Sequence, residues 1–521
     1  MTERSDSLTR ELQELRDKSP AEALRRVDEL DETPNGRATA AIILIDCGDA
    51  LGDLASVSRG VDILEALSAE IAFSPDIAYN LANGLQLRAR HSVESEMSFR
   101  GQVADDRFRA RVHFGAVMND TSASLATQSR MLTNIGILFL ETHRWVEALD
   151  CFQHAQRILP TNAVAAYQEM RRLMSLANLF FQKEETYRSY CHVDALCQRV
   201  RYLASVISKN YDVFEQFAGA SALPEVQKAV EQALTFDEVP AKPVDIPYFS
   251  FVRRNNIALS LHCSTEEFSS GRFDLLTIPH VHTSLLDESG VPEIFAMMNV
   301  MKADFAFARQ VFFEVREDDA GTPYFETTSH ADTLDYAVYG VRYSALTTAQ
   351  RIAFDILDKI SVAIACYLKL PQAQKTSFIN IWGKQEKGKG FLLSGPVEAE
   401  LIGGNQPLIA LFNIFQDVSR HENLGDGFMG AQKQFRNSST HRFTVLHDMG
   451  RDHSSKLSAI DHNNLEQFEQ LTLASLRLAR AALFYFVDFI IFSERHKDNA
   501  QGALVLSSEV PDHDYIRGRK E

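Results

Sequence analysis

The segment Leu465–Arg495 most strongly constrains what this chain can fold into. Its spacing predicts one long helix, and apolar residues lie on more than one face of that helix. They are Leu471, Leu473, Leu476, Leu478, Leu483, Phe484, Phe486, Val487, Phe489, Ile490 and Ile491. A helix that is apolar on several faces is stable in water only when it is buried. We therefore expect it to lie inside a helical bundle or in a subunit interface.

Two further segments predict helices that can surround it. Leu346–Leu370 has apolar residues at helical spacing, and Pro407–Phe415 is a shorter apolar run. The apolar-patterned residues 428–435 come just before a polar segment and predict a fourth helix. The C-terminal half of the chain is therefore expected to be an all-helical bundle.

The polar segment that follows is Arg436-Asn437-Ser438-Ser439-Thr440-His441. On a helix, Asn437 and His441 share one face, and the long side chain of Arg436 can reach the same place. The imidazole can transfer protons near neutral pH, and the guanidinium can stabilise negative charge on phosphorus. Arg436, Asn437 and His441 are therefore the candidate catalytic residues for breaking a phosphodiester without a metal ion.

This Arg-Asn-x3-His pattern resembles the motif of the HEPN superfamily. The likeness covers residues 330–500, and the segment from Leu334-Asp335-Tyr336 to Ile360 resembles the opening of a HEPN branch joined to tetratricopeptide repeats. It implies a dimer in which two motifs share one cleft. There, His441 would move protons while a ribose 2′-hydroxyl attacks phosphorus, Arg436 would stabilise the charge and Asn437 would orient the reacting groups. It also implies a bacterial defence, abortive-infection or toxin role.

Residues 129–162 resemble one tetratricopeptide repeat, although Leu132 stands for the usual Trp. Small residues at Gly136 and Ala148 allow two helices to approach, Phe152 fills the space beside them, and Pro160 ends the second helix. One repeat cannot bury its own apolar face, so neighbouring hairpins must stack on it. A helical solenoid is expected, with a protein or peptide ligand.

Changes in composition suggest the domain limits. We expect a solenoid over 1–235, a connecting module over 236–330, a HEPN domain over 331–500 and a polar tail over 501–521. Within the module, residues 249–252 and 258–261 predict short extended segments, and 292–315 predicts a helix. The expected fold class is therefore mainly α, with a small mixed module.

The net charge of −17 argues against a broad nonspecific nucleic-acid surface, although a local basic site remains compatible with it. Lys384, Lys387 and Lys389 gather in one predicted loop, and Arg442 follows His441. We interpret these four residues as candidate RNA-binding residues, with a solvated loop as the alternative.

Three other readings of the sequence predict different chemistry. Gly383–Gly390 nearly matches a P-loop, but Gly390 replaces the magnesium-binding Ser or Thr. A metal nuclease is a second reading, because potential ligands are dense between residues 441 and 462. They are His441, His447, Asp448, Asp452, His453, Asp461 and His462, but their spacing matches no standard site. The pairs His280-x-His282 and His330-x-Asp332 are weaker still. Third, Phe443 occupies the place of a Tyr that some HEPN proteins use to accept a nucleotidyl group, which argues against that regulation.

The remaining features predict a cytoplasmic protein. The N-terminus has no apolar signal core, the run 481–492 is too short to span a bilayer, and the six cysteines form no CxxC pair. The expected partners are an RNA substrate and a second copy of the chain, with no cofactor, no metal and no membrane. The competing hypothesis is a non-catalytic scaffold that binds RNA, nucleotide or protein.

Overall fold

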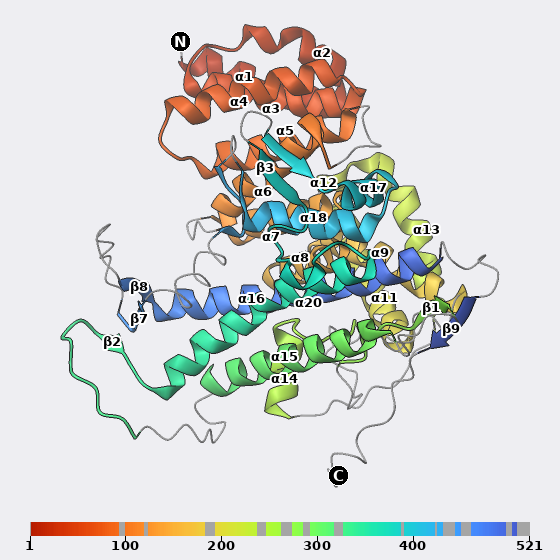
Figure 1. Ribbon diagram of the computed structural model, residues 1–521. Coiled ribbons are helices and arrows are strands. Elements are labelled where there is room, and N and C mark those ends of the chain that lie inside the picture. The colour runs from red at the N-terminus through yellow and green to blue at the C-terminus, as the bar shows by residue number, and fades with distance from the viewer. Residues whose placement is uncertain are drawn as a thin grey trace. The chain divides into compact units, whose positions relative to one another are not determined.

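The computed structural model is mainly helical, which confirms the predicted fold class (Figure 1). It describes residues 2–92, 99–118, 123–182, 193–236, 246–261, 274–284, 292–316, 327–386, 390–421, 425–430, 443–449, 460–495 and 503–507. These residues belong to two compact units, each assembled from separate stretches of chain. The domain limits expected from the sequence stay predictions.

The first unit comprises residues 1–142, 151–162 and 420–428. Its helices are α1 (Thr2–Lys18), α2 (Pro20–Arg26), α3 (Pro34–Leu51), α4 (Leu54–Glu70), α5 (Pro75–His91), α6 (Gly101–Met118) and α7 (Leu125–Glu141). The strands β5 (Arg420–His421) and β6 (Gly425–Asp426) pair in the same unit. Several helices begin at a side-chain cap, since Thr33, Asp53, Ser74 and Ser124 each accept a hydrogen bond from the first turn.

The close approach expected at Gly136 is present in this unit. A Cβ atom added to Gly136 of α7 would lie 2.5 Å from the ring of Phe152 in α8 (Trp145–Ile158). Ser129 also donates a hydrogen bond to the Ala155 carbonyl, and Asn162 donates one to the Ser129 hydroxyl. The two helices therefore approach closely at Gly136, as predicted, while the identity of the hairpin as a tetratricopeptide repeat stays a resemblance.

The second unit comprises residues 143–150, 163–419 and 429–521. Its helices are α9 (Ala163–Gln182), α11 (Val193–Ser208), α12 (Tyr211–Ala218), α13 (Leu223–Ala233), α14 (Pro247–Arg254), α15 (Glu293–Arg316), α16 (Val341–Tyr367), α17 (Gly395–Ile402), α18 (Gln406–Val418) and α20 (Leu465–Arg495). Helices α15 and α16 lie side by side, and α20 contacts α15, α16 and α18 (Figure 1). The helices predicted over 346–370, 407–415 and 465–495 are thus confirmed, with small shifts at their ends.

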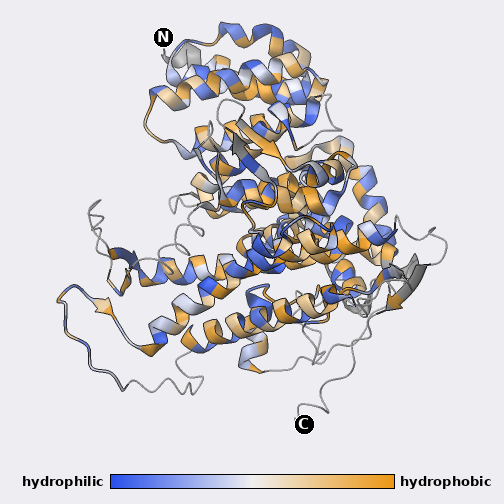
Figure 2. Ribbon diagram, viewed as in Figure 1, coloured by the Kyte–Doolittle hydropathy of each residue, from blue (hydrophilic) through white to orange (hydrophobic). Residues whose placement is uncertain are grey.

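Helix α20 is covered by its own chain. Along its apolar part, from Leu476 to Ile491, the side chains of nearly all residues are buried, and Figure 2 shows this part as mostly orange. The first turn of α8, which belongs to the same unit, adds Trp145 against Phe484 and Tyr485, with ring centroids 5.7 and 6.4 Å apart. The expected burial is confirmed, and no second subunit is needed to explain it.

A buried ionic network lies beside this contact. The guanidinium of Arg144 donates hydrogen bonds to the carboxylates of Glu147 and Asp417. The hydroxyl of Tyr485 in α20 donates to Glu147 over 3.1 Å and accepts the backbone N–H of Val146 over 3.1 Å. The side chains of Arg144 and Asp417 are fully buried. This network joins the start of α8, the end of α18 and the middle of α20.

One local prediction was wrong. Residues 249–252 lie in α14 rather than in an extended segment, because Pro247 opens a helix and Phe251 packs on Phe312 and Phe313 of α15. Tertiary contacts override local preference there. Within the expected tail, β9 (Ala503–Ser507) pairs antiparallel with β1 (His280–Ser284). The helix predicted over 292–315 is present as α15.

Within the described part of the chain, no helix has the combination of length and hydropathy that crossing a membrane requires.

Candidate functional site

The motif itself lies outside the described residues. Arg436, Asn437, His441 and Arg442 fall within 431–442, and Lys387 and Lys389 fall within 387–389. Their roles therefore stay predictions. What the structure does describe is how the chain enters and leaves the motif segment.

Two consecutive residues, Phe428 and Met429, make tertiary contacts just before the chain enters the motif segment. In the first unit, Phe428 packs on α6 and α7: its ring lies 6.4 Å from that of Phe139, and a Cβ atom on Gly115 would lie 2.5 Å from it. In the second unit, the next residue, Met429, donates its backbone N–H to the Asp417 carbonyl at the end of α18 over 2.8 Å. Arg436 follows only seven residues after Met429.

The chain leaves the motif segment through a three-stranded sheet. Strand β7 (Phe443–His447) begins directly after Arg442 and pairs in parallel with β8 (Ile460–Asn464), which runs straight into α20. On its other side β7 pairs antiparallel with β2 (Ala337–Val338), which leads into α16. The sheet therefore joins the segment that precedes α16 to the segment that precedes α20 (Figure 1).

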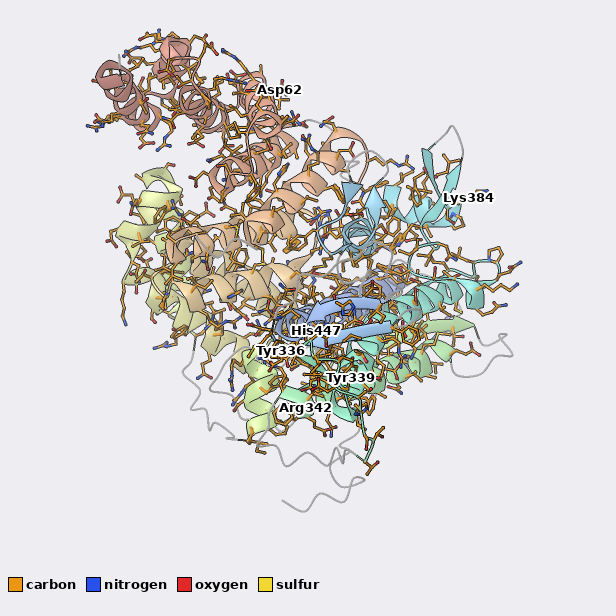
Figure 3. All side chains as sticks on the ribbon, turned by 90° about the vertical axis from the view of Figure 1, so that its left-hand side faces the viewer. Asp62, Tyr336, Tyr339, Arg342, Lys384 and His447 are labelled. Atoms are coloured by element: carbon orange, nitrogen blue, oxygen red, sulfur yellow. The ribbon has the colours of Figure 1, made fainter. Side chains whose placement is uncertain are left out.

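His447 at the end of β7 is buried, with 1% of its surface exposed. Its Nδ1–H donates a hydrogen bond to the backbone carbonyl of Asp335 over 2.9 Å, and its Nε2 lies 2.8 Å from Nδ1 of His462 in β8. Figure 3 shows His447 close to Tyr336, with Tyr339 and Arg342 on the adjoining segment. His447 is therefore a buried, hydrogen-bonded side chain and not an exposed polar residue of this histidine-rich stretch.

Asp335 forms a cluster of potential metal ligands with His447 and His462, and it is held in a strained turn. Its Oδ1 accepts hydrogen bonds from the Thr333 hydroxyl at 2.5 Å and from the Ala337 backbone at 3.3 Å. The flanking residues Leu334 and Tyr336 have φ angles of +56° and +58°, which residues other than glycine rarely adopt. Sequence reasoning missed this partner because Asp335 and His447 are 112 residues apart.

Among the other metal-ligand candidates, His441, Asp452 and His453 lie outside the described residues. The pair at 280 and 282 is described and lies at another place in the second unit. His282 donates its backbone N–H to Glu494 of α20, and its Nδ1 lies 2.8 Å from the same carboxylate. This contact holds β1 on α20, so the His280-x-His282 pair has a structural explanation.

The P-loop alternative is excluded by the shape of its segment. Strand β3 (Gly383–Glu386) pairs antiparallel with β4 (Gly390–Leu393) in a hairpin, whereas a P-loop leads from a strand directly into a helix. Lys384 is an exposed residue of this hairpin, and Figure 3 shows it well away from His447. Its role as an RNA-binding residue stays a prediction.

Exposed apolar side chains surround the sheet that follows the motif. Phe443 is 73% exposed, and Ile460, its partner in the neighbouring strand, is 38% exposed. Leu334 and Tyr336 are 84% and 67% exposed. Phe443 and Ile460 are paired in the β7–β8 register and therefore lie side by side on one face. They form an exposed apolar pair at the start of β7, whereas Tyr336 is bonded to Asp448 at the other end of that strand. Such exposed large apolar residues indicate an interaction surface.

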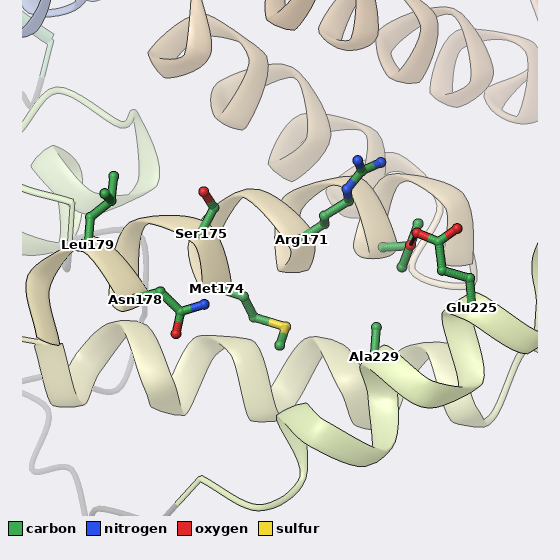
Figure 4. Close-up of a pocket in the computed structure, with 8 residues that line it drawn as sticks. Arg171, Met174, Ser175, Asn178, Leu179, Glu225 and Ala229 are labelled. Atoms are coloured by element: carbon green, nitrogen blue, oxygen red, sulfur yellow. Dashed lines mark hydrogen bonds between the residues drawn. The ribbon is translucent and has the colours of Figure 1, made fainter. Parts of the chain in front are cut away.

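A shallow pocket lies between α9 and α13 in the helical part of the second unit (Figure 4). Its volume is about 400 Å³, and its lining residues are Tyr167, Arg171, Met174, Ser175, Asn178, Leu179, Glu225 and Ala229. The lining combines apolar area with a cation, an anion and an amide. Such a lining suits a peptide better than a purely apolar ligand.

Comparison with known proteins relates the C-terminal region to one family. No curated protein and no solved structure matches the chain. Residues 285–493 match the model of the LA2681-like HEPN family. The matched region includes α15, which the sequence had assigned to the connecting module. The match supports the assignment of residues 285–493 to the HEPN superfamily, whose domains are typically ribonucleases.

Proposed function

We propose that the protein is a metal-independent endoribonuclease of the HEPN type that acts in bacterial defence, abortive infection or a toxin-like stress response. One observation carries the proposal: the family match spans residues 285–493 and therefore includes Arg436, Asn437 and His441 at the spacing of the HEPN motif. The anchoring of the motif segment by Met429 and by β7 supports it, because catalytic groups need a rigid support.

The proposed reaction uses the RNA itself as the nucleophile. His441 takes the proton of a ribose 2′-hydroxyl while the 2′-oxygen attacks the adjacent phosphorus. The bond from phosphorus to the 5′-oxygen then breaks, and that oxygen receives a proton from an imidazolium, giving a 2′,3′-cyclic phosphate and a 5′-hydroxyl. Arg436 stabilises the charge that develops on the phosphoryl oxygens, and Asn437 orients the phosphate.

The first prediction concerns this chemistry. Purified protein should cleave total RNA or tRNA in the presence of EDTA and leave 2′,3′-cyclic phosphate ends. His441→Ala should reduce the rate by about 10²–10⁴-fold, because it removes a proton-transfer group. His330→Ala, which changes an exposed histidine in the same region, should leave the rate unchanged.

Two results would contradict the proposal. One is cleavage that EDTA abolishes and Mg²⁺ or Mn²⁺ restores, and the other is an unchanged rate in His441→Ala. RNA binding without cleavage by the wild-type protein would favour the non-catalytic scaffold instead.

We further propose that two copies pair beside the motif. The described chain itself buries the apolar surface of α20, so that surface does not call for a second copy. A different surface supports pairing: Phe443 and Ile460 are exposed side by side, and they come just after the motif segment. A second copy that covers this surface would bring two motifs close together, as the resemblance implies.

The second prediction tests this surface. Phe443→Asp should convert a dimer into monomers and lower RNA cleavage in parallel, because burying an unpaired carboxylate at an interface is costly. Phe73→Asp changes a phenylalanine that is 61% exposed in the first unit and should do neither. Light scattering gives the mass. A folded wild-type monomer that cleaves RNA would contradict the proposal.

We also propose that the N-terminal helices restrain the nuclease until they bind a protein or peptide, for which the pocket between α9 and α13 is a candidate site. A direct route for this restraint is Phe428, which packs on Gly115 and Phe139 and lies eight residues before Arg436. Movement of α6 or α7 would shift the point from which the motif segment starts.

The third prediction tests that route in the full chain. Phe428→Ala should raise the rate of RNA cleavage by roughly 5–150-fold, the usual range for coupling between two sites. Phe391→Ala is the matched control, because Phe391 packs on Phe415 in the second unit and is 40% exposed. An unchanged or lower rate in Phe428→Ala would show that this contact does not restrain the enzyme.

A further inference from the structure

We propose that Asp335, His447 and His462 form a binding site for one divalent transition-metal ion, with zinc as the best fit. The sequence showed potential metal ligands between residues 441 and 462 at no standard spacing, and the proposed RNA chemistry uses no metal ion. This inference is therefore independent of the proposed function. The ion would clamp the sheet formed by β2, β7 and β8.

The three side chains already converge. One potential ligand atom from each residue lies within 4.8 Å of the other two. Nε2 of His447 and Nδ1 of His462 are only 2.8 Å apart. Ligands bound at about 2.0–2.2 Å to a single zinc ion lie roughly 3–4 Å apart, so small side-chain movements would complete the site.

The hydrogen bond from Nδ1 of His447 to the Asp335 carbonyl determines the tautomer of the His447 ring. A carbonyl oxygen can only accept, so the contact between His447 Nδ1 and the Asp335 carbonyl places the proton on Nδ1. Nε2 then carries a lone pair directed at His462. Metal-binding histidines characteristically donate their other N–H to a carbonyl or carboxylate in this way. Without an ion, a single proton of His462 can fill the space between the two nitrogens.

The sheet explains why these residues meet. His462 pairs with Val445 in the parallel register, so it lies on the same face of the sheet as His447, two residues along β7. His447 pairs with Ala337 of β2, and the turn just before β2 brings Asp335 back to His447, whose ring donates to the Asp335 carbonyl. The strained turn at Leu334 and Tyr336 fixes Asp335 there. Backbone strain of this kind is characteristic of functional sites.

The ligand types favour one class of ion. Two imidazoles and one carboxylate suit Zn²⁺ and similar ions, whereas Mg²⁺ and Ca²⁺ prefer oxygen ligands. Three protein ligands leave a fourth tetrahedral position for water. Because β7 and β8 are joined through the ion and β8 leads into α20, binding should stabilise the fold around the end of the motif segment.

The test is metal binding by the full-length protein without RNA. Protein stripped with a chelator is titrated with Zn²⁺ against a chromophoric chelator, and separately with Co²⁺, whose visible spectrum reports a tetrahedral site. Wild type should bind one ion at this site and unfold at a higher temperature when zinc is added. His462→Ala should weaken binding by at least about 100-fold, since second-shell changes alone cost 10–100-fold, and should abolish both the tetrahedral cobalt spectrum and the thermal shift.

Two variants serve as controls. Asn463→Ala changes the next residue of β8, which lies on the opposite face of the sheet, and should bind zinc as wild type does. His330→Ala removes a nearby exposed histidine and should also behave as wild type. Circular dichroism at low temperature shows whether His462→Ala is folded, and His462→Gln provides a second variant if it is not.

The proposal is overturned if wild type shows no tetrahedral cobalt spectrum, or if His462→Ala and His462→Gln bind zinc as tightly as wild type. Either result would mean that His447 and His462 form a hydrogen-bonded pair only. RNA cleavage is not measured in this test, so its outcome and that of the proposed function can be told apart.

Discussion

The packing of α8, α18 and α20 in the second unit depends on one buried charge, the guanidinium of Arg144. Arg144 lies between Glu147, one turn later in the chain, and Asp417, at the end of α18, and water reaches neither Arg144 nor Asp417. Burial disfavours the charged form of Arg144, but the two carboxylates outweigh that effect and hold its pKa above the ordinary value. Removing one partner of a buried ion pair typically costs about 3–5 kcal/mol, because a charge is left unpaired. Arg144 therefore favours the packing of α8, α18 and α20 against one another.

The proposed function depends on the same contacts. Asp417 binds Arg144 through its carboxylate and Met429 through its carbonyl, so one residue links the ionic network to the start of the motif segment. Tyr485 connects the network to α20, and α20 begins where β8 and β7 meet. Burial and the charge of Glu147 raise the pKa of Tyr485 well above its ordinary value, so its hydroxyl remains a hydrogen-bond donor at neutral pH.

The sequence predicted the helices well and their partners poorly, for a physical reason. Periodicity shows which face of a helix must be buried, so the burial of α20 could be predicted from Leu476, Phe484 and Ile491. It does not show what covers that face. The covering residue Trp145 belongs to another half of the chain, and its contact with Asp488 joins residues 343 positions apart. A second subunit was therefore an equally valid prediction from the sequence.

The candidate site likewise has one part that local sequence spacing predicts and another that depends on tertiary contacts. The candidate motif residues could be proposed from the sequence because all three lie within six positions of the chain, where local spacing is informative. His447 and His462 were among the potential metal ligands in the sequence, but their convergence with Asp335 was missed because only the tertiary structure brings the three together. The packing of Phe428 on Gly115 and the helix at 247–254 are likewise results of tertiary contact. No pattern in the sequence contains that information.

The most direct test of this account is native-state hydrogen exchange on Arg144→Ala. The account predicts that amides in the first turn of α8, in α18 and in α20 lose protection together, by about 3–5 kcal/mol. Arg316→Ala, which breaks a partly exposed ion pair with Glu469, should change protection by less than about 1 kcal/mol. Loss of protection confined to α8, with α18 and α20 unchanged, would contradict the claim that this buried charge holds the helices around the motif together.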